Sequence, residues 1–203
     1  FGEGKDDVAA YAAALPLEAR PGERWGYSSG TTNIVCRIVG DAIAPRYGDG
    51  EAGMTAFMRE RLFDPIGMDS AIPKFDARGT FIGSSFVYAT ARDFARFGEL
   101  YRNDGRWDDT RILPAGWVDH ARQPTPVPDA EPFGYGAHWW LWRNEPDSLA
   151  CHGYEGQRTI VVPSRELVLV RLGKTPAEQG PNVDALLADM VGCFASAPES
   201  ASK

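Results

Sequence analysis

Two short segments of this sequence carry groups that could do chemistry. The first, Pro21 to Gly30, presents Tyr27 and Ser29 after a Pro-Gly pair that favours a tight turn. The Ser, Gly and Thr residues at 28–32 are typical of a helix start, where the helix dipole favours an anion. The second segment reads His152-Gly153-Tyr154. By itself, a tyrosine before a helix is more typical of a packing residue with a hydrogen-bonded hydroxyl than of a catalyst.

The hydrophobic periodicity predicts helices first and antiparallel strands afterwards. Expected helices lie at 6–15, at 31–44 with Pro45 as the end, at 54–62, at 90–102 and at 114–121. Residues 67–89 are punctuated by Gly, Pro and Ser, which predicts a long loop with short extended pieces. Strands are expected at 135–143, 158–162 and 167–172, with a turn at 163–166. Apolar residues from 183 to 194 predict a covering C-terminal helix.

These elements divide the chain into four regions. Residues 1–123 form a mainly helical region, and 124–134 form a proline-rich connector or lid. Residues 135–196 carry the antiparallel strands and the last helix, and 197–203 are expected to be a flexible tail. The fold class predicted from this order is α/β, in the α+β sense.

Composition excludes several classes of partner. A net charge of −7 and a pI near 5.0 argue against nucleic acid and anionic membranes. No apolar run approaches the ~20 residues of a membrane span. The three cysteines, Cys36, Cys151 and Cys193, lack metal-ligand spacing and predict buried free thiols. We therefore expect no metal and no cofactor.

Five segments in a fixed order resemble one enzyme family. They are Pro21-Gly22-x-x-x-x-Tyr27-Ser28-Ser29, Leu62-Phe63-Asp64-Pro65-Ile66-Gly67-Met68, Tyr88 to Gly98, Gly153-x-x-Gly156-Gln157 and Val161 to Val170. Over roughly residues 1–195, the chain resembles the serine β-lactamase and penicillin-binding-protein superfamily. The resemblance is to its class C-like branch, which holds the family VIII esterases and the 6-aminohexanoate-oligomer hydrolases. A β-lactamase-like fold is what this resemblance implies.

The resemblance also implies roles for the two segments. Tyr27 would be the general acid/base that carries a proton to the leaving group. The backbone N–H of Tyr154, or an N–H one residue away, would donate to the oxyanion. His152 and Gly153 stand roughly where such enzymes carry a Lys-Thr-Gly or His-x-Gly strand. His152 would line the pocket or face a substrate carboxylate, although a lone histidine beside a strand is more often structural.

The chain departs from the family pattern at two places. Ser29 occupies the asparagine position of the Tyr-x-Asn motif, and a hydroxyl cannot replace both the donor and the acceptor of a carboxamide. Ser29 could equally serve as a helix N-cap. The lysine of Lys-Thr-Gly is absent, which favours esters or linear amides over β-lactams as substrates. The tryptophans of the aromatic segment 139–142 could line a pocket for an apolar group or fill the core.

The nucleophile of the family, a serine in a Ser-x-x-Lys motif, has no convincing match. No serine precedes Tyr27, and the one such motif, Ser200-Ala201-Ser202-Lys203, lies in the tail. Ser70 and Lys74 are four residues apart and also fail. No Gly-x-Ser-x-Gly elbow is present, which disfavours an α/β-hydrolase. We expect the chain to be the C-terminal part of a hydrolase, inactive alone, whose N-terminal part supplies the nucleophile.

The sequence thus predicts part of a β-lactamase-like serine hydrolase that cleaves esters or linear amides through an acyl-serine intermediate. Two alternatives stay open: a non-catalytic module that has kept the pocket, and a true β-lactamase or penicillin-binding carboxypeptidase. Its expected partners are a small ester or amide substrate and the missing N-terminal part. Without that part, an unpaired sheet edge is expected. The sequence does not indicate a compartment.

Overall fold

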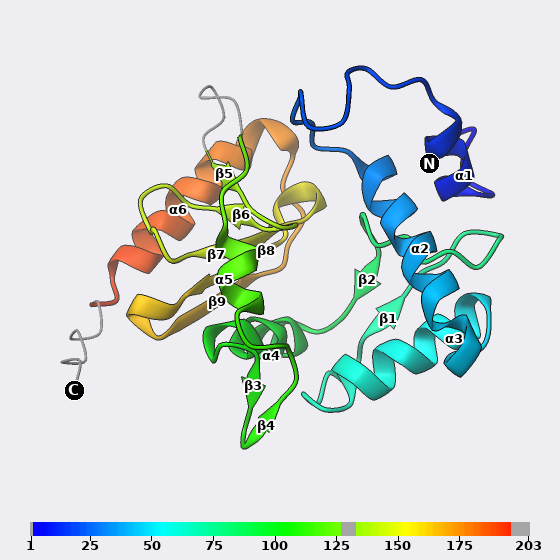
Figure 1. The fold of residues 1–203 in the computed structure, drawn as a ribbon. Coiled ribbons are helices and arrows are strands. Elements are labelled where there is room, and N and C mark those ends of the chain that lie inside the picture. Colours follow the sequence, from blue (N-terminus) through cyan, green and yellow to red (C-terminus); the bar gives the residue numbers. More distant parts are fainter. Residues whose placement is uncertain (1, 127–132, 196–203) are drawn as a thin grey trace. The chain divides into compact units, whose positions relative to one another are not determined.

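A computed structural model describes residues 2–126 and 133–195 of the chain. Contacts divide the chain into two compact units, Phe1–Thr90 and Ala91–Lys203 (Figure 1). The tail at 197–203, with its Ser-x-x-Lys, lies outside the described residues, as does most of the proline-rich connector. The compositional regions 1–123, 124–134 and 135–196 stay a prediction.

The first unit is mainly helical. It contains α1 (Val8–Ala14), α2 (Ser29–Tyr47), α3 (Gly50–Met58), a π-helical turn at Arg59–Phe63, and two short paired strands, β1 (Ile72–Pro73) and β2 (Val87–Tyr88). The three predicted helices are confirmed, but the prediction that Pro45 ends the second one was wrong. Pro45 sits in the last turn of α2, where the helix loses only the hydrogen bond from this residue to the carbonyl four residues earlier. The helix ends instead at Gly48, whose φ of 86° few other residues adopt.

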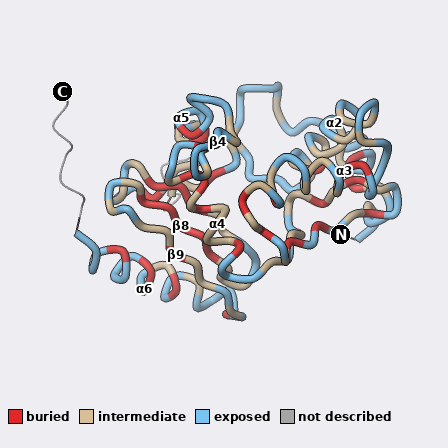
Figure 2. The backbone as a smooth tube through the Cα atoms, turned by 90° about the horizontal axis from the view of Figure 1, so that it is seen from below, coloured by how far each residue is buried: buried red, intermediate tan, exposed pale blue. Residues whose placement is uncertain are grey.

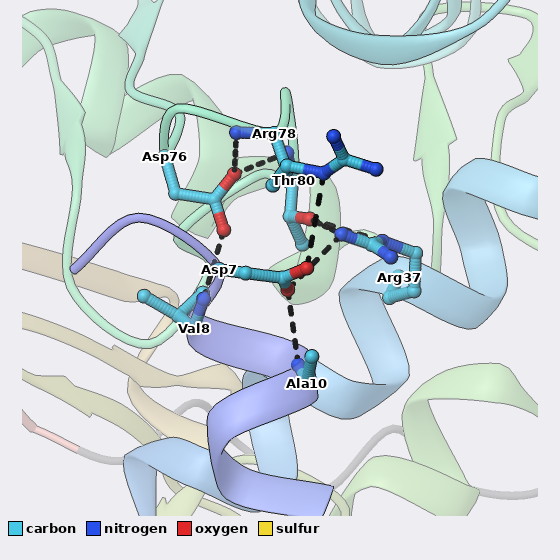
Figure 3. Close-up of polar contacts among 7 residues, drawn as sticks. All are labelled: Asp7, Val8, Ala10, Arg37, Asp76, Arg78 and Thr80. Carbon is cyan, nitrogen blue, oxygen red and sulfur yellow. Dashed lines mark hydrogen bonds and ion pairs between the residues drawn. The ribbon is translucent and has the colours of Figure 1, made fainter. Parts of the chain in front are cut away.

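Two aspartates hold α1 against the rest of this unit (Figure 3). Asp7 caps α1 by accepting from the N–H of Ala10 at 3.0 Å, and it also accepts from the Arg37 guanidinium of α2 at 3.2 Å. The buried Asp76 accepts from the N–H groups of Val8 and Thr80, at 2.9 and 2.8 Å. Because these acceptors are charged, their hydrogen bonds are stronger than neutral ones. The start of α1 is therefore fixed by long-range polar contacts.

The second unit is built on an antiparallel sheet. Its described strands run in sequence order as β5 (Gly134–Tyr135), β6 (Trp140–Leu141), β7 (Leu149–His152), β8 (Arg158–Val162) and β9 (Leu167–Arg171). Three helices accompany them, α4 (Ala91–Arg102), α5 (Trp117–Arg122) and α6 (Gly180–Gly192), with a small hairpin of β3 (Arg106–Trp107) and β4 (Thr110–Arg111). The predicted antiparallel meander and covering helix are confirmed.

Apolar side chains pack on both faces of this sheet. On one face α6 contributes Val183, Leu187 and Val191 to a cluster with Ile160 and other strand residues. On the other face, strand residues join Tyr101 of α4 with Val118 and Ala121 of α5. Gly98 lets α4 approach closely, since a Cβ there would lie 2.6 Å from Val168. The sheet is thus a core layer between helices (Figures 1 and 2).

Two predictions on the strands were wrong. Residues 135–143 do not form one strand, because the N–H of Gly136 donates to the Trp139 carbonyl at 2.8 Å and turns the chain between β5 and β6. His138 in that turn has a φ of 61°. The strand β7 was not predicted, although it is central. Its four residues lie next to turn residues and give too short a pattern to recognise.

The cysteines are free thiols, as predicted, but they are not all buried. Cys193 is exposed at the end of α6. Cys151 packs in the α4-facing cluster, and burial raises the pKa of its thiol to about 12. Burial also raises the pKa of the partly buried Cys36 thiol. The thiols of Cys36 and Cys151 are therefore poor nucleophiles.

Candidate active site

Tyr27 lies in the first unit, directly before α2. Residues 24–28 are not part of a regular element, and Ser28 is the N-cap, with its hydroxyl accepting from the N–H of Thr31 at 3.4 Å. The Tyr27 side chain is 57% exposed. The alternative that Ser29 is the N-cap was wrong by one residue, since Ser29 is the first residue of the helix. Ser29 is exposed too, so its hydroxyl can meet a ligand.

Further along α2, a second polar side chain is noteworthy. In this helix, which is described over its whole length, only Asn33 is buried, and its Oδ1 has no hydrogen-bond partner among the described residues. Asn33 was not singled out from the sequence. A cavity of about 160 Å³ lies beside the same helix, lined by residues from Cys36 to Phe81. Tyr27 and Ser29 are not in its lining, so the cavity is not evidence for their role.

The second segment lies in the second unit, where β7 ends at His152. Gly153 is extended, and Tyr154–Gly156 form a short 3-10 turn in which Glu155 and Gly156 have φ values of 55° and 84°. The strand that the resemblance places at His152 and Gly153 ends at His152, because the left-handed Glu155 and Gly156 cannot continue it. Gly156 and Gln157 form the bend into the next strand, since β8 starts at Arg158.

The backbone N–H groups of this turn differ in their use. The N–H of Gly153 donates to the Gln157 carbonyl at 2.8 Å and closes the turn. A Cβ on Gly153 would lie 2.8 Å from that of Gln157, so glycine permits this closure. The N–H of Tyr154 is the first of the 3-10 turn and has no partner within the turn. The Tyr154 residue as a whole is 86% exposed.

His152 belongs to an aromatic cluster. Its ring stacks on Trp140 with centroids 5.4 Å apart and meets Phe133 edge-on at 4.7 Å. The indole N–H of Trp142 donates to Nε2 of His152 at 3.3 Å, so the neutral ring carries its proton on Nδ1. Burial, helped by the positive charge of Arg158, lowers the pKa of His152 to about 3. His152 is therefore uncharged at neutral pH.

The tryptophans of segment 139–142 divide between core and surface. Trp139 and Trp142 are buried, one in each apolar cluster, which matches the core-filling alternative for these two residues. Trp140 is only partly buried and packs against Tyr135 as well as His152. Only Trp140 of the three presents part of its ring for other contacts.

Two arginines that sequence reasoning did not single out also contact the turn. Arg158 and Arg171 both donate to carbonyl groups between Gly153 and Gly156. A signal for them exists in the sequence: in the predicted hairpin, positions 158 and 171 are equally far from the turn at 163–166 and so must pair. Tyr27 and Ser29 are thus neighbours in one unit, and His152, Gly153 and Tyr154 are neighbours in the other.

Among residues 2–126 and 133–195, no cluster of three or more His, Cys, Asp or Glu side chains could hold a metal ion. In the same residues, no helix combines the length and apolar character needed to cross a bilayer.

The comparisons with known proteins identify the class. The family model described as Beta-lactamase matches residues 2–190, so the chain belongs to the β-lactamase family. No match was found among curated proteins. The family and its similar structures are hydrolases with this fold, which confirms the predicted resemblance and the β-lactamase-like fold class.

Three solved structures are similar to this chain. A Bacillus anthracis protein, proposed as a 6-aminohexanoate-dimer hydrolase, matches with a TM-score of 0.74 and 25% identity over 92% of this chain and 48% of its own. A proposed β-lactamase from Bacteroides dorei has a TM-score of 0.61 at 15% identity, covering 92% and 64%. A β-lactamase from Mycobacterium bovis matches with a TM-score of 0.57 and 20% sequence identity, over 91% of this chain and 73% of its own. The chain thus spans about half the length of the first of these.

Proposed function

We propose that this chain is the C-terminal part of a serine hydrolase that cleaves carboxylic esters or linear amides through an acyl-serine intermediate. The nucleophilic Ser-x-x-Lys would come from a part of the protein outside this chain. Tyr27 would move the proton between the serine and the leaving group. Ser29, His152 and Gly153 would line the substrate site. Membership of the β-lactamase family supports a hydrolase, and the finer assignment is our inference.

The observation that carries the proposal is the state of the N–H groups after β7. The Gly153 N–H is used inside the turn, while that of Tyr154 starts the turn and has no partner within it. A preorganised donor of this kind stabilises the oxyanion of acyl transfer, and removing one such donor typically costs about 10²–10³ in kcat. This supports Tyr154, in preference to Gly153, as the oxyanion donor.

The uncharged state of His152 favours esters or linear amides over β-lactams. A β-lactam carries a carboxylate, which is best met by a cation. His152 is neutral because burial lowers its pKa to about 3, so it can offer only its Nδ1–H. The similarity to a proposed 6-aminohexanoate-dimer hydrolase favours the linear-amide part of the proposal.

Exposed apolar side chains support a partner from the same protein. On α2, Val35, Ile38 and Val39 have helical spacing, and Ile38 is 60% exposed. Leu186 and Met190 on α6 and Phe194 just after it are likewise exposed. Within the described residues, β9 pairs on one side only. We infer that the remaining part of the protein covers these surfaces, since stripes of this kind are normally buried.

A serine-directed fluorophosphonate probe followed by intact mass spectrometry tests the nucleophile. The full-length protein is expected to gain one probe mass, on a serine outside these residues. The 203-residue chain alone is expected to gain none. Labelling of the chain alone would contradict the proposal. Stable acylation by a penicillin would instead favour the β-lactamase or carboxypeptidase alternative.

Tyr27→Phe in the full-length protein tests the proton shuttle. We expect kcat for a p-nitrophenyl ester to fall by about 10²–10⁴, the usual contribution of a positioned acid/base, while KM changes little. The control is Tyr11→Phe, because Tyr11 is an exposed tyrosine of the same unit on α1. An unchanged kcat in Tyr27→Phe would remove Tyr27 from the mechanism.

A further inference from the structure

Two arginines face each other across the hairpin of β8 and β9. Arg158 is the first residue of β8 and Arg171 the last of β9, and the ladder pairs them directly. Like charges directly opposite each other in an antiparallel pair destabilise a sheet. The repulsion between the two guanidinium groups must therefore be offset by other interactions. Both side chains donate hydrogen bonds to carbonyl groups of the turn that follows β7.

Arg158 is tied to α6 and to the turn. Its side chain is 9% exposed, and its Nε donates to the Asp184 carboxylate at 2.9 Å. Its Nη1 donates to the carbonyls of Gln157 at 3.1 Å and Gly153 at 3.4 Å. The ion pair with Asp184 thus holds a guanidinium group against both ends of the turn.

Arg171 holds the middle of the same turn. Its Nη1 donates to the carbonyls of Gly156 and Gly173, both at 2.8 Å, and more weakly to that of Glu155 at 3.4 Å. Its Nη2 donates to the Thr175 hydroxyl. In the part of the chain that the structure describes, no carboxylate lies within ion-pair distance of Arg171, so neutral oxygens surround its charge. A Cβ at Gly156 would lie 2.8 Å from Nη1, so glycine makes room for the guanidinium.

The side chain of Gln157 completes the attachment. Its Nε2 donates to the Gly173 carbonyl at 2.7 Å, and its Oε1 accepts from the Gly173 N–H at 2.9 Å. The N–H of Thr175 donates to the Glu155 carbonyl at 3.0 Å. The turn is therefore bound to residues 171–175 at several points along its length.

These contacts set the direction of the Tyr154 N–H. In a trans peptide the C=O and the next N–H point in opposite directions. Because the Gly153 carbonyl faces Arg158, the N–H of Tyr154 faces away from it. We propose that Arg158 and Arg171 are positioning residues, which hold the turn so that the Tyr154 N–H stays directed at the substrate. This inference rests on the proposed function, since it assigns a purpose to the proposed oxyanion donor.

The test compares Arg171→Met and Arg171→Lys with the wild type in the full-length protein. Arg102→Met is the control, because Arg102 is a partly buried arginine of the same unit, bound to Glu99 and away from the turn. Hydrogen exchange of a peptide covering residues 150–158 measures the turn without using activity. For Arg171→Met we expect turn amides to exchange about tenfold faster, while those around Ile160 stay protected.

The second readout is the kinetics of ester hydrolysis. Misplacing an oxyanion donor should lower kcat by about 10- to 100-fold in Arg171→Met, with KM changed far less and partial recovery in Arg171→Lys. A merely structural arginine would lower the active fraction without recovery by lysine. Unchanged exchange in Arg171→Met would overturn the inference, and so would faster exchange with an unchanged kcat. If the wild type hydrolyses no ester or amide, the proposed function fails, and the exchange result alone decides whether Arg171 holds the turn.

Discussion

The two units of the chain place their candidate residues by different means. In the first, Tyr27 precedes a helix whose start is set by its neighbour Ser28, and α2 buries only Asn33 over its described length. In the second, Tyr154 lies in a turn to which the side chains of Arg158 and Arg171 donate, while Gln157 binds the backbone of Gly173 after β9. Both apolar clusters found in the described residues also belong to the second unit.

This difference teaches how each residue depends on the rest of the molecule. A position set by a helix cap is local, and it survives as long as the helix forms. A position set by hydrogen bonds from Arg158 and Arg171 requires the hairpin of β8 and β9 and the helix α6 to be folded. The first unit therefore has a helix with an exposed apolar face, whereas the second carries the Tyr154 turn on a sheet with its own core. Four substitutions sharpen or break this comparison.

The largest effect is expected for core truncation in the second unit. Ile160 is fully buried between β8 and α6, so Ile160→Ala should cost about 2–5 kcal/mol of unfolding free energy. Ile38→Ala on α2 should cost less than about 0.5 kcal/mol in this chain, because Ile38 is exposed. Urea unfolding followed by tryptophan fluorescence suits the first variant, since all tryptophans except Trp25 lie in the second unit. Circular dichroism at 222 nm follows α2 in the second variant.

The same Ile38→Ala variant examines the proposed partner. In the full-length protein, the loss of unfolding free energy caused by Ile38→Ala should rise to the range found for truncation of buried side chains, because the rest of the protein would cover α2. An equally small loss of unfolding free energy in the chain and in the full-length protein would contradict that coverage. The comparison of the two units would then hold for the chain alone.

An intermediate effect is expected at the polar anchor of the first unit. Asp76→Ala removes the acceptor of the Val8, Arg78 and Thr80 N–H groups, which should cost about 2–3 kcal/mol. Limited proteolysis should then cut first near α1. The control is Asp6→Ala, which removes an exposed carboxylate just before α1 and should change the unfolding free energy little. Equal stabilities would mean that α1 is held by its apolar contacts.

The smallest effect is a pH dependence in the second unit. Because His152 has a pKa near 3 in the fold and near 6.5 when unfolded, the unfolded state binds the extra proton between these values. Stability therefore falls as the pH decreases below 6.5, by about 1–2 kcal/mol between pH 7.5 and 5. His152→Gln keeps an acceptor for Trp142 and should remove this part of the acid sensitivity. Unfolding titrations at the two pH values measure it, with His120→Gln on α5 as the control. An equal slope in both variants would show that His152 is not the group responsible.

Much of the fold follows from local sequence signals. Serine, glycine and threonine before an apolar stripe predicted α2, and the spacing around Pro163 to Glu166 predicted the hairpin of β8 and β9. Both signals act within a few residues, which is why they are readable without the fold. The ordered motifs also indicated the β-lactamase family, which the family match confirms. The roles of Tyr27, Ser29, His152, Gly153 and Tyr154 remain predictions.

What the sequence could not decide depends on groups that are distant along the chain. The turn after His152 is closed by Gln157, but it is also hydrogen-bonded to Arg171 and Gly173, which lie 15 and 16 residues from their partners in the sequence. The neutral state of His152 comes from its burial among Phe133, Trp140 and Trp142, which lie on other strands or beside them. The sequence by itself determined the helices, the hairpin and the family. Only the tertiary structure decided how the turn after His152 is attached to residues 171–175 and that His152 is uncharged, because both follow from packing between strands.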